Sequence, residues 1–293
     1  MTDSRLCNPS FIRELLSRHN FRSSKSLGQN FLIEHWVPEQ IAESAELSED
    51  VGVLEIGPGI GCLTSELANR AGKVVAVELD RKLEPILVET LGGFNNVETV
   101  FGDALKLDLP TLVRDALNGY RPVVCANLPY NITSPLLTAL IEAKCFDEIT
   151  VMIQREVAKR ICAAPGSSEY GAFTVFVNWH AEPEILFDVP PECFMPAPKV
   201  TSSVIRLVPR DAPPISVLDE KLFNRVVRSS FAQRRKTLVN GLDSAFTELT
   251  KLQLQAAVSC IGLDLNVRGE TLDIATFAAL SDQLFLLLIN NSD

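Results

Sequence analysis

The order of apolar and polar positions along the first 210 residues predicts alternating strands and helices. Between the first two apolar runs, Leu63 and Leu67 lie four positions apart, which is the spacing of one helix face. Seven runs have the apolar or alternating character of strands, and they span residues 51–56, 74–78, 97–101, 123–126, 148–153, 172–179 and 202–208. Helices separate most of them, so we expect an α/β fold with a seven-stranded, mainly parallel sheet. No helix separates the last two, which predicts an antiparallel hairpin at one edge.

The pattern changes after a short linker. The segment RDAPPIS at 210–216 is polar and proline-rich, as linkers are. Beyond it, apolar residues recur at intervals of three and four, which predicts a small all-helical domain over 217–293. We therefore expect three parts: an N-terminal arm over 1–30, an α/β domain over 31–210 and the helical domain.

Composition excludes several classes of protein. With 293 residues, 46% of them hydrophobic, the chain can bury a sufficient core without disulfides. The seven cysteines show no paired spacing and the three histidines are dispersed, so we expect neither a disulfide framework nor a metal site. No apolar run reaches the length of a membrane span, and the first residues lack the pattern of a signal peptide. We therefore expect a cytoplasmic protein with no membrane contact.

The charge is unevenly distributed. A net charge of −10 argues against nucleic-acid binding, which depends on lysine and arginine. However, residues 221–240 hold six basic residues and no acidic one, and residues 1–30 hold five basic residues against two acidic ones. Each segment is either a solvated helix face or a surface for phosphate groups.

A glycine-rich turn predicts a nucleoside site. Gly57, Gly59 and Gly61 come directly after the first strand and before a helix, where glycines let a ligand approach the backbone. Glu78 lies 21 positions after Gly57, at the end of the second strand, where an acid can hold a ribose diol. Asp103 ends the third strand and is placed to accept a hydrogen bond from an adenine amino group.

The nucleoside is predicted to be S-adenosylmethionine rather than a dinucleotide. The glycines follow the spacing Gly-x-Gly-x-Gly, and Glu55 precedes them by two residues. A carboxylate there would repel a pyrophosphate, but it suits the cationic amino-acid end of S-adenosylmethionine. This favours a methyltransferase over a dinucleotide-dependent dehydrogenase.

The fourth strand ends in a motif suited to methylating an adenine. Asn127-Leu128-Pro129-Tyr130 follows the buried run 123–126, so it faces the same crevice as the glycine turn. The side-chain carbonyl of Asn127 and the backbone carbonyl of Leu128 can accept both hydrogens of an adenine amino group, which frees the nitrogen lone pair. The ring of Tyr130 offers a surface on which the base can stack.

A second aromatic residue precedes the last strand. Phe194 lies in a proline-rich loop, PPECFMPAPKV, where it could cover the other face of a flipped-out base. The alternative is that Phe194 only anchors this loop.

The motifs together resemble the KsgA family of small-subunit ribosomal RNA adenine dimethyltransferases. SLGQNFL, EIGPGIGCLT, GDAL, NLPYNITSPLL, QREVAKRI and FMPAPKVTSSVIRL occur in this order between about residues 20 and 210. The resemblance implies the Rossmann-like fold of class I methyltransferases and S-adenosylmethionine as donor. It also implies dimethylation of N6 of two adjacent adenines in the 3′-terminal hairpin loop of 16S rRNA, in the assembling small ribosomal subunit.

The resemblance also assigns residues. It places cofactor contacts on Asn30, Leu32, Gly57, Glu78, Asp103 and Asn127. It places contacts to the target base on Asn127, Leu128, Tyr130 and Phe194. The basic segment QRRK, residues 233–236, resembles the RNA-facing part of the family's tail domain.

Two alternatives stay open. One is the sister family that methylates an adenine of large-subunit rRNA and confers antibiotic resistance, although FMPAPKVTSSVIRL and the long tail favour the small subunit. The other is a non-catalytic ribosome assembly factor, against which Asn127 and Tyr130 argue. We expect a monomer.

Overall fold

The computed structural model describes residues 4–22, 28–233 and 235–290. The first two residues of the SLGQNFL motif, and Arg234 of the basic segment, lie outside these ranges.

The chain divides into two compact units. The sheet unit comprises residues 1–158 and 182–209, and the helical unit comprises residues 159–181 and 210–293. The sequence prediction assigned 159–181 to the α/β domain, whereas the structure builds the helical unit from two separate stretches of chain.

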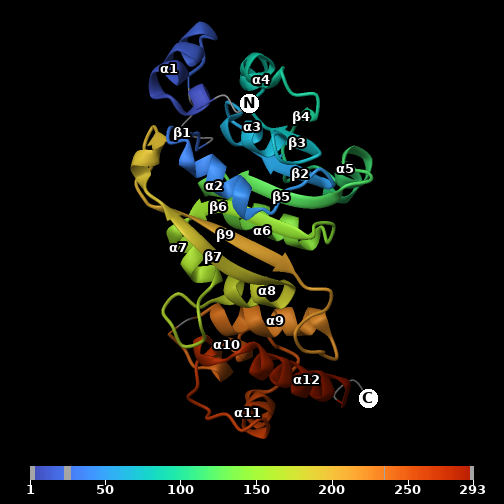
Figure 1. Ribbon diagram of the computed structural model, residues 1–293. Helices are drawn as coiled ribbons and strands as arrows, with labels where there is room; N and C mark the ends of the chain where they lie inside the picture. Colours follow the sequence, from blue (N-terminus) through green and yellow to red (C-terminus); the bar gives the residue numbers. More distant parts are fainter. Residues whose placement is uncertain (1–3, 23–27, 234, 291–293) are drawn as a thin grey trace. The chain divides into compact units, whose positions relative to one another are not determined.

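A seven-stranded sheet forms the centre of the sheet unit (Figure 1). Its strands are β2 (Val51–Ile56), β3 (Lys73–Glu78), β4 (Val97–Phe101), β5 (Arg121–Asn127), β6 (Glu148–Gln154), β7 (Ala181–Val189) and β9 (Ser202–Pro209). Their order across the sheet is β4-β3-β2-β5-β6-β9-β7. The first five strands pair in parallel, whereas β9 is antiparallel to β6. Every residue of β2 is buried, as expected for a parallel strand covered on both faces.

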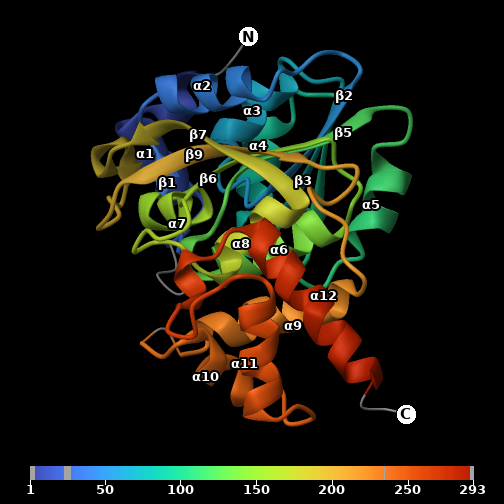
Figure 2. The same ribbon diagram turned by 90° about the horizontal axis from the view of Figure 1, so that it is seen from below.

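Helices cover both faces of this sheet. They are α2 (Trp36–Ser44), α3 (Cys62–Ala68), α4 (Glu84–Leu91), α5 (Leu109–Ala116), α6 (Thr133–Glu142) and α7 (Arg155–Ile161). Ile41 of α2 and Leu67 of α3 share a buried cluster with Val53 of β2 and Val123 of β5. α6 lies on the opposite face from α2 and α3 (Figure 2).

The strand order creates a crevice next to β2. From β2 the chain proceeds outward through β3 to β4, and then returns to place β5 on the other side of β2. The connections after β2 and after β5 therefore leave the sheet in opposite directions. In sheets of this kind, ligands bind in the resulting gap at the carboxyl ends of the strands.

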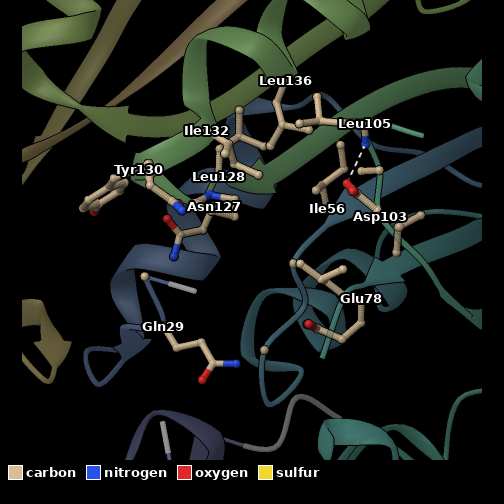
Figure 3. A pocket seen from close by; sticks show the side chains of 18 of the residues that line it. Gln29, Ile56, Glu78, Asp103, Leu105, Asn127, Leu128, Tyr130, Ile132 and Leu136 are labelled. Carbon is tan, nitrogen blue, oxygen red and sulfur yellow. Dashed lines mark hydrogen bonds between the residues drawn. The ribbon is translucent and has the colours of Figure 1, made fainter. Parts of the chain in front are cut away.

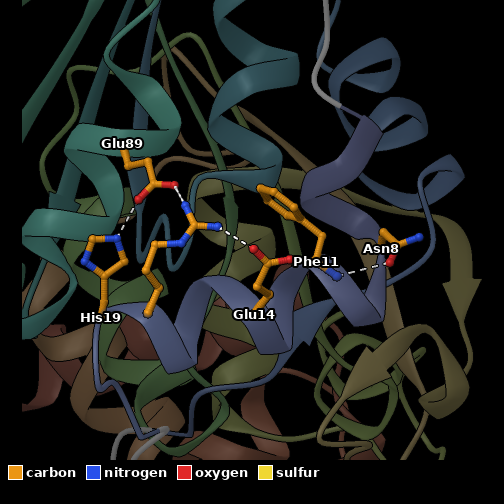
Figure 4. A network of polar contacts seen from close by, with 6 residues as sticks. Asn8, Phe11, Glu14, His19 and Glu89 are labelled. Carbon is orange, nitrogen blue, oxygen red and sulfur yellow. Dashed lines mark hydrogen bonds and ion pairs between the residues drawn. The ribbon is translucent and has the colours of Figure 1, made fainter.

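Within the sheet unit, the N-terminal arm forms helix α1 (Pro9–Arg18), and the short strand β1 (Phe31–Leu32) follows the arm. The side chain of Asn8 caps α1 by accepting hydrogen bonds from the backbone N–H groups of Ser10 and Phe11, the second of which is drawn in Figure 4. Leu15 of α1 lies in a buried cluster with Phe31 and with Leu87 of α4. β1 pairs antiparallel with β8 (Phe194–Met195).

The helical unit has its own core. Its helices are α8 (Ala172–His180), α9 (Glu220–Phe231), α10 (Leu238–Asp243), α11 (Lys251–Cys260) and α12 (Ile274–Asn290). Trp179 of α8 stacks on Phe223 of α9 with ring centroids 4.0 Å apart, and Phe246 and Phe277 are fully buried. Among the described helices, none is both long and apolar enough to span a membrane.

The prediction of a strand over 172–179 is wrong, because this segment forms α8. The hydroxyl of Thr174 accepts a hydrogen bond from the N–H of Gly171 at 3.1 Å, which stabilises the first turn of the helix. Val175 and Trp179, four positions apart, both enter the core of the helical unit. The seventh strand is instead β7, directly after α8, and β9 lies between β6 and β7.

Candidate active site

A pocket of about 260 Å³ opens at the carboxyl ends of the parallel strands, in the crevice beside β2 (Figure 3). Residues from the arm, the glycine turn and the ends of β3, β4 and β5 line it. The residues predicted from the sequence that line this pocket are Asn30, Gly57, Glu78, Asp103, Asn127, Leu128 and Tyr130.

The glycine turn lines the pocket between Phe31 and the end of β5. Gly57 and Gly59 have φ angles of +75° and +59°, which favour glycine. A Cβ atom on Gly59 would lie 3.5 Å from the ring of Phe31, and one on Gly57 would lie 4.0 Å from the carbonyl oxygen of Asn127. The turn therefore brings the arm and the end of β5 to the same pocket.

Two carboxylates follow the neighbouring strands. Glu78 ends β3, is 6% exposed, and its Oε1 accepts a hydrogen bond from the N–H of Asp80 at 2.7 Å. Burial raises the pKa of Glu78, and this N–H counteracts the rise. Asp103 follows β4, and its Oδ1 accepts a hydrogen bond from the N–H of Leu105 at 3.1 Å (Figure 3).

The end of β5 presents an unsatisfied acceptor. The side-chain oxygen of Asn127 is buried and accepts no hydrogen bond from the described residues. A buried oxygen without a donor costs free energy, so its retention in a pocket suggests that a ligand supplies the donor. The N–H of Leu128 donates to the carbonyl of Met152 in β6, which fixes the turn after β5.

The position of the Tyr130 ring is fixed by a contact with β9. Its hydroxyl is hydrogen-bonded to the hydroxyl of Ser202, the first residue of β9. Burial raises the pKa of the Tyr130 phenol, with the bond to Ser202 counteracting the rise, so the ring remains neutral at physiological pH. The ring therefore offers an uncharged, oriented face at the pocket.

Glu55 does not have the role that its position suggested. It is 1% exposed, is not among the residues that line the pocket, and lies in the same strand as the fully buried Leu54. Burial raises the pKa of Glu55 to about 8. In place of the expected carboxylate beside the cationic end of the ligand, Glu55 is thus a buried acid that holds its proton below about pH 8.

Leu32 and Phe194 do not line the pocket. They are cross-strand partners between β1 and β8, 4% and 2% exposed, and belong to the core cluster beneath α2 and α3. The structure therefore places Phe194 as an anchor of its loop, because its neighbours on both strands exclude it from the surface.

The sequence analysis missed several lining residues. Leu79 and Leu105 are apolar yet 51% and 40% exposed, and each follows an acidic residue of the site by one or two positions. Gln29 of the arm and Phe31 of β1 also line the pocket. In the sequence, only the closeness of these residues to Asn30, Glu78 and Asp103 indicated that they belong to the site. The pattern of apolar positions does not show which apolar side chains face a ligand.

Fold and site together define a Rossmann-like methyltransferase that binds a nucleoside. The sequence pattern of the family described as "Ribosomal RNA adenine dimethylase" matches residues 19–284. The chain is 44% identical to Ribosomal RNA small subunit methyltransferase A of Alkaliphilus oremlandii, over 96% of this chain and 98% of that protein. It is 45% identical to the protein of the same name from Geobacillus kaustophilus, over 95% and 97% of the two chains.

Solved structures agree with this grouping. A dimethyladenosine transferase from Plasmodium falciparum superposes with a TM-score of 0.71 at 26% identity, covering 89% of this chain and 98% of that one. The 23S rRNA methyltransferase ErmE superposes with a TM-score of 0.67 at 28% identity, covering 87% and 100%. The chain belongs to the ribosomal RNA adenine dimethylase family. It is an enzyme that methylates ribosomal RNA, with S-adenosylmethionine as the methyl donor.

Proposed function

We propose that the enzyme transfers two methyl groups to N6 of each of two adjacent adenines in the 3′-terminal hairpin loop of 16S rRNA. The proposed substrate is the assembling small ribosomal subunit in the cytoplasm, and the proposed active form is a monomer. The observation that carries the chemistry is the buried oxygen of Asn127 beside the glycine turn, which accepts no hydrogen bond from any residue that the structure describes. Relatives named for the small subunit, at 44–45% identity over nearly the whole chain, favour this RNA.

The pocket fits S-adenosylmethionine on the side of the glycine turn. Glu78 and Asp103 provide acceptors at the ends of β3 and β4, for a ribose diol and an adenine amino group. Asn30 and the backbone at Gly57 complete the proposed contacts. When bound, S-adenosylmethionine supplies a methyl group carried on a sulfonium centre.

Asn127 and Leu128 are proposed to activate the target nitrogen. The lone pair of an adenine amino group is delocalised into the ring, so the group is a poor nucleophile. Two acceptors that take its hydrogens favour a pyramidal nitrogen, and the Asn127 side-chain oxygen and the Leu128 carbonyl would be those acceptors. No base of unusual pKa is required, because the methylated nitrogen loses its proton readily.

Tyr130 is proposed to hold the base flat against the pocket. The bond between its hydroxyl and Ser202 fixes the ring at the end of β5, so a flipped-out adenine can stack on it without ordering the side chain. For Phe194 the proposed role changes from direct contact to support, since its side chain is buried in the core cluster that also contains Leu32.

The decisive experiment is Asn127→Ala. Because the acceptor acts mainly in the transition state, we expect turnover to fall about 10²–10³-fold while the Kd of S-adenosylmethionine stays within about tenfold. Single-turnover methylation of small subunits lacking the modification measures the first quantity, and calorimetry the second. Asn95→Ala, in an exposed turn of the sheet unit, serves as the control. Turnover within a fewfold of wild type would contradict the proposed chemistry.

The proposed RNA is tested separately. Mass spectrometry of rRNA from cells with and without the protein should show the loss of two adjacent dimethyladenines near the 3′ end of 16S rRNA. A change confined to 23S rRNA would contradict the small-subunit assignment and support the sister reaction.

A further inference from the structure

Residues 28–31, which end the arm and begin β1, line one side of the pocket, and we call them the strap. At one end, Gly28 has a φ of +66°, and a Cβ atom there would lie 3.6 Å from the side-chain oxygen of Asn131, which follows the β5 motif. At the other end, Phe31 packs on Gly59 and pairs with Met195 of β8. The strap therefore connects the β5 side of the pocket with the glycine turn.

Between these ends, the side chain of Gln29 reaches toward the β3 side of the pocket (Figure 3). Its Nε2 donates a hydrogen bond to Oδ2 of Asp80 at 3.2 Å. Gln29 lines the pocket, whereas Asp80 lies just outside it, two residues after Glu78. This bond joins two segments 51 residues apart in sequence across the same opening.

Asp80 also positions Glu78. Its backbone N–H donates to Glu78 Oε1 at 2.7 Å, and its Oδ1 accepts a hydrogen bond from the N–H of Lys82 at 3.1 Å, which starts the 3-10 helix Arg81–Leu83. Asp80 thus orients the carboxylate of Glu78, which is proposed to hold the ribose. It also binds Gln29 of the strap. The charge on Asp80 strengthens the bond to Gln29, since hydrogen bonds with one ionised partner are the stronger ones.

We propose that Gln29 and Asp80 form a latch that closes the strap over the bound cofactor. Both are positioning residues: the latch keeps Asn30 and Phe31 against the pocket and slows the release of the cofactor. The proposal rests on the proposed function in one respect, namely that S-adenosylmethionine occupies this pocket beside Glu78. Breaking the latch should raise the rate of cofactor release about tenfold, which corresponds to the lower end of the free energy that one hydrogen bond to a charged group contributes.

The test uses an exchange of donor and acceptor. Gln29→Ala removes the bond, and Gln29→Glu places two carboxylates together, so both should release tritiated S-adenosylmethionine about tenfold faster in a chase with unlabelled compound. Adding Asp80→Asn to Gln29→Glu reverses the bond, because the amide at position 80 then donates to the carboxylate at position 29. The amide oxygen at position 80 can still accept the hydrogen bond from the N–H of Lys82. The double variant should therefore return to within about threefold of wild type. The KM for the cofactor should follow these changes, whereas kcat should vary less than about twofold.

The controls separate this proposal from the function on which it rests. Gln40→Glu adds the same charge on an exposed position of α2, away from the pocket, and should leave release unchanged. Release from Gln29→Ala within twofold of wild type, or a double variant that stays as fast as Gln29→Glu, would overturn the latch. If Glu78→Gln weakens binding in that case, the cofactor site stands and only the latch fails. If wild type binds no S-adenosylmethionine, both fail.

Discussion

Glu55 and Glu78 lie on neighbouring strands, and both are almost excluded from water. Glu78 retains a backbone donor and lines the pocket, whereas Glu55 lies within β2, where burial dominates and raises its pKa to about 8. Residue type and spacing could identify both acids in the sequence. They could not show that Glu78 lines the pocket and that Glu55 does not. Which face of a fully buried strand a side chain occupies depends on the packing of helices from distant parts of the chain.

The pKa of Glu55 makes stability depend on pH. Its folded pKa of about 8 exceeds the unfolded value, so between roughly pH 4.5 and 8 the native state holds a proton that the unfolded state has lost. Stability from this group is present below pH 4.5 and declines as pH rises to 8. Glu55→Gln, which is always neutral, should therefore gain on the order of 3 kcal/mol over wild type between pH 5 and pH 8.

Urea unfolding at the two pH values measures this difference. Glu43→Gln, on the exposed face of α2, is the matched control and should show no such trend. An equal effect of Glu55→Gln at both pH values would mean that Glu55 is ionised in the native state.

Among the elements, the arm helix α1 shows which contacts hold a peripheral segment in place. Arg18 and His19 both pair with Glu89 of α4, and Arg18 pairs also with Glu14 (Figure 4). These groups are partly exposed, so water and salt screen them. Beneath them, Leu15 is fully buried in the cluster that includes Phe31 of the strap.

We therefore expect apolar burial to outweigh the ion pairs. Leu15→Ala should lower the free energy of unfolding by about 2–4 kcal/mol, whereas Glu89→Ala should lower it by less than about 1 kcal/mol. Urea titrations of both variants provide the comparison. A loss for Glu89→Ala equal to that for Leu15→Ala would show that the charged network anchors the arm.

Burial in a core also explains why helix α8 was predicted as a strand. Residues 172–179 contain β-branched and aromatic side chains, which favour strands, yet the segment is helical because Val175 and Trp179 meet the core of the helical unit on one face. The true edge strand, β7, was missed because it carries Glu182, Pro183 and Glu184. The parallel strands β2, β3, β5 and β6 were predictable because burial on both faces leaves them mainly apolar.

For the whole molecule, the question is how a chain with a net charge of −10 binds RNA. Arg235 and Lys236, at the end of the loop after α9, are exposed, and residues 221–240 hold no acid. Local positive charge can therefore offset the overall charge if RNA contacts this part of the helical unit.

Removing these two charges tests that contact. Arg235→Gln with Lys236→Gln should weaken binding to small subunits and reduce the slope of log K against log salt by about 1–2, since each lost phosphate contact reduces it by somewhat less than one. Arg114→Gln with Lys144→Gln, which are exposed in the sheet unit, removes the same charge elsewhere. Equal slopes for the two double variants would exclude this surface as an RNA contact.

The split construction of the helical unit limits how the protein can be recombined. Its core joins Trp179, which precedes the last two paired strands β7 and β9, with Phe223 and Phe277, which follow them. A tail beginning at residue 210 would lack the indole that fills its interior, and a catalytic half ending there would expose that indole to water. Residues 210–293 alone therefore cannot be exchanged between two relatives without loss of the core. A chimera that exchanges the helical unit needs a second junction ahead of α8.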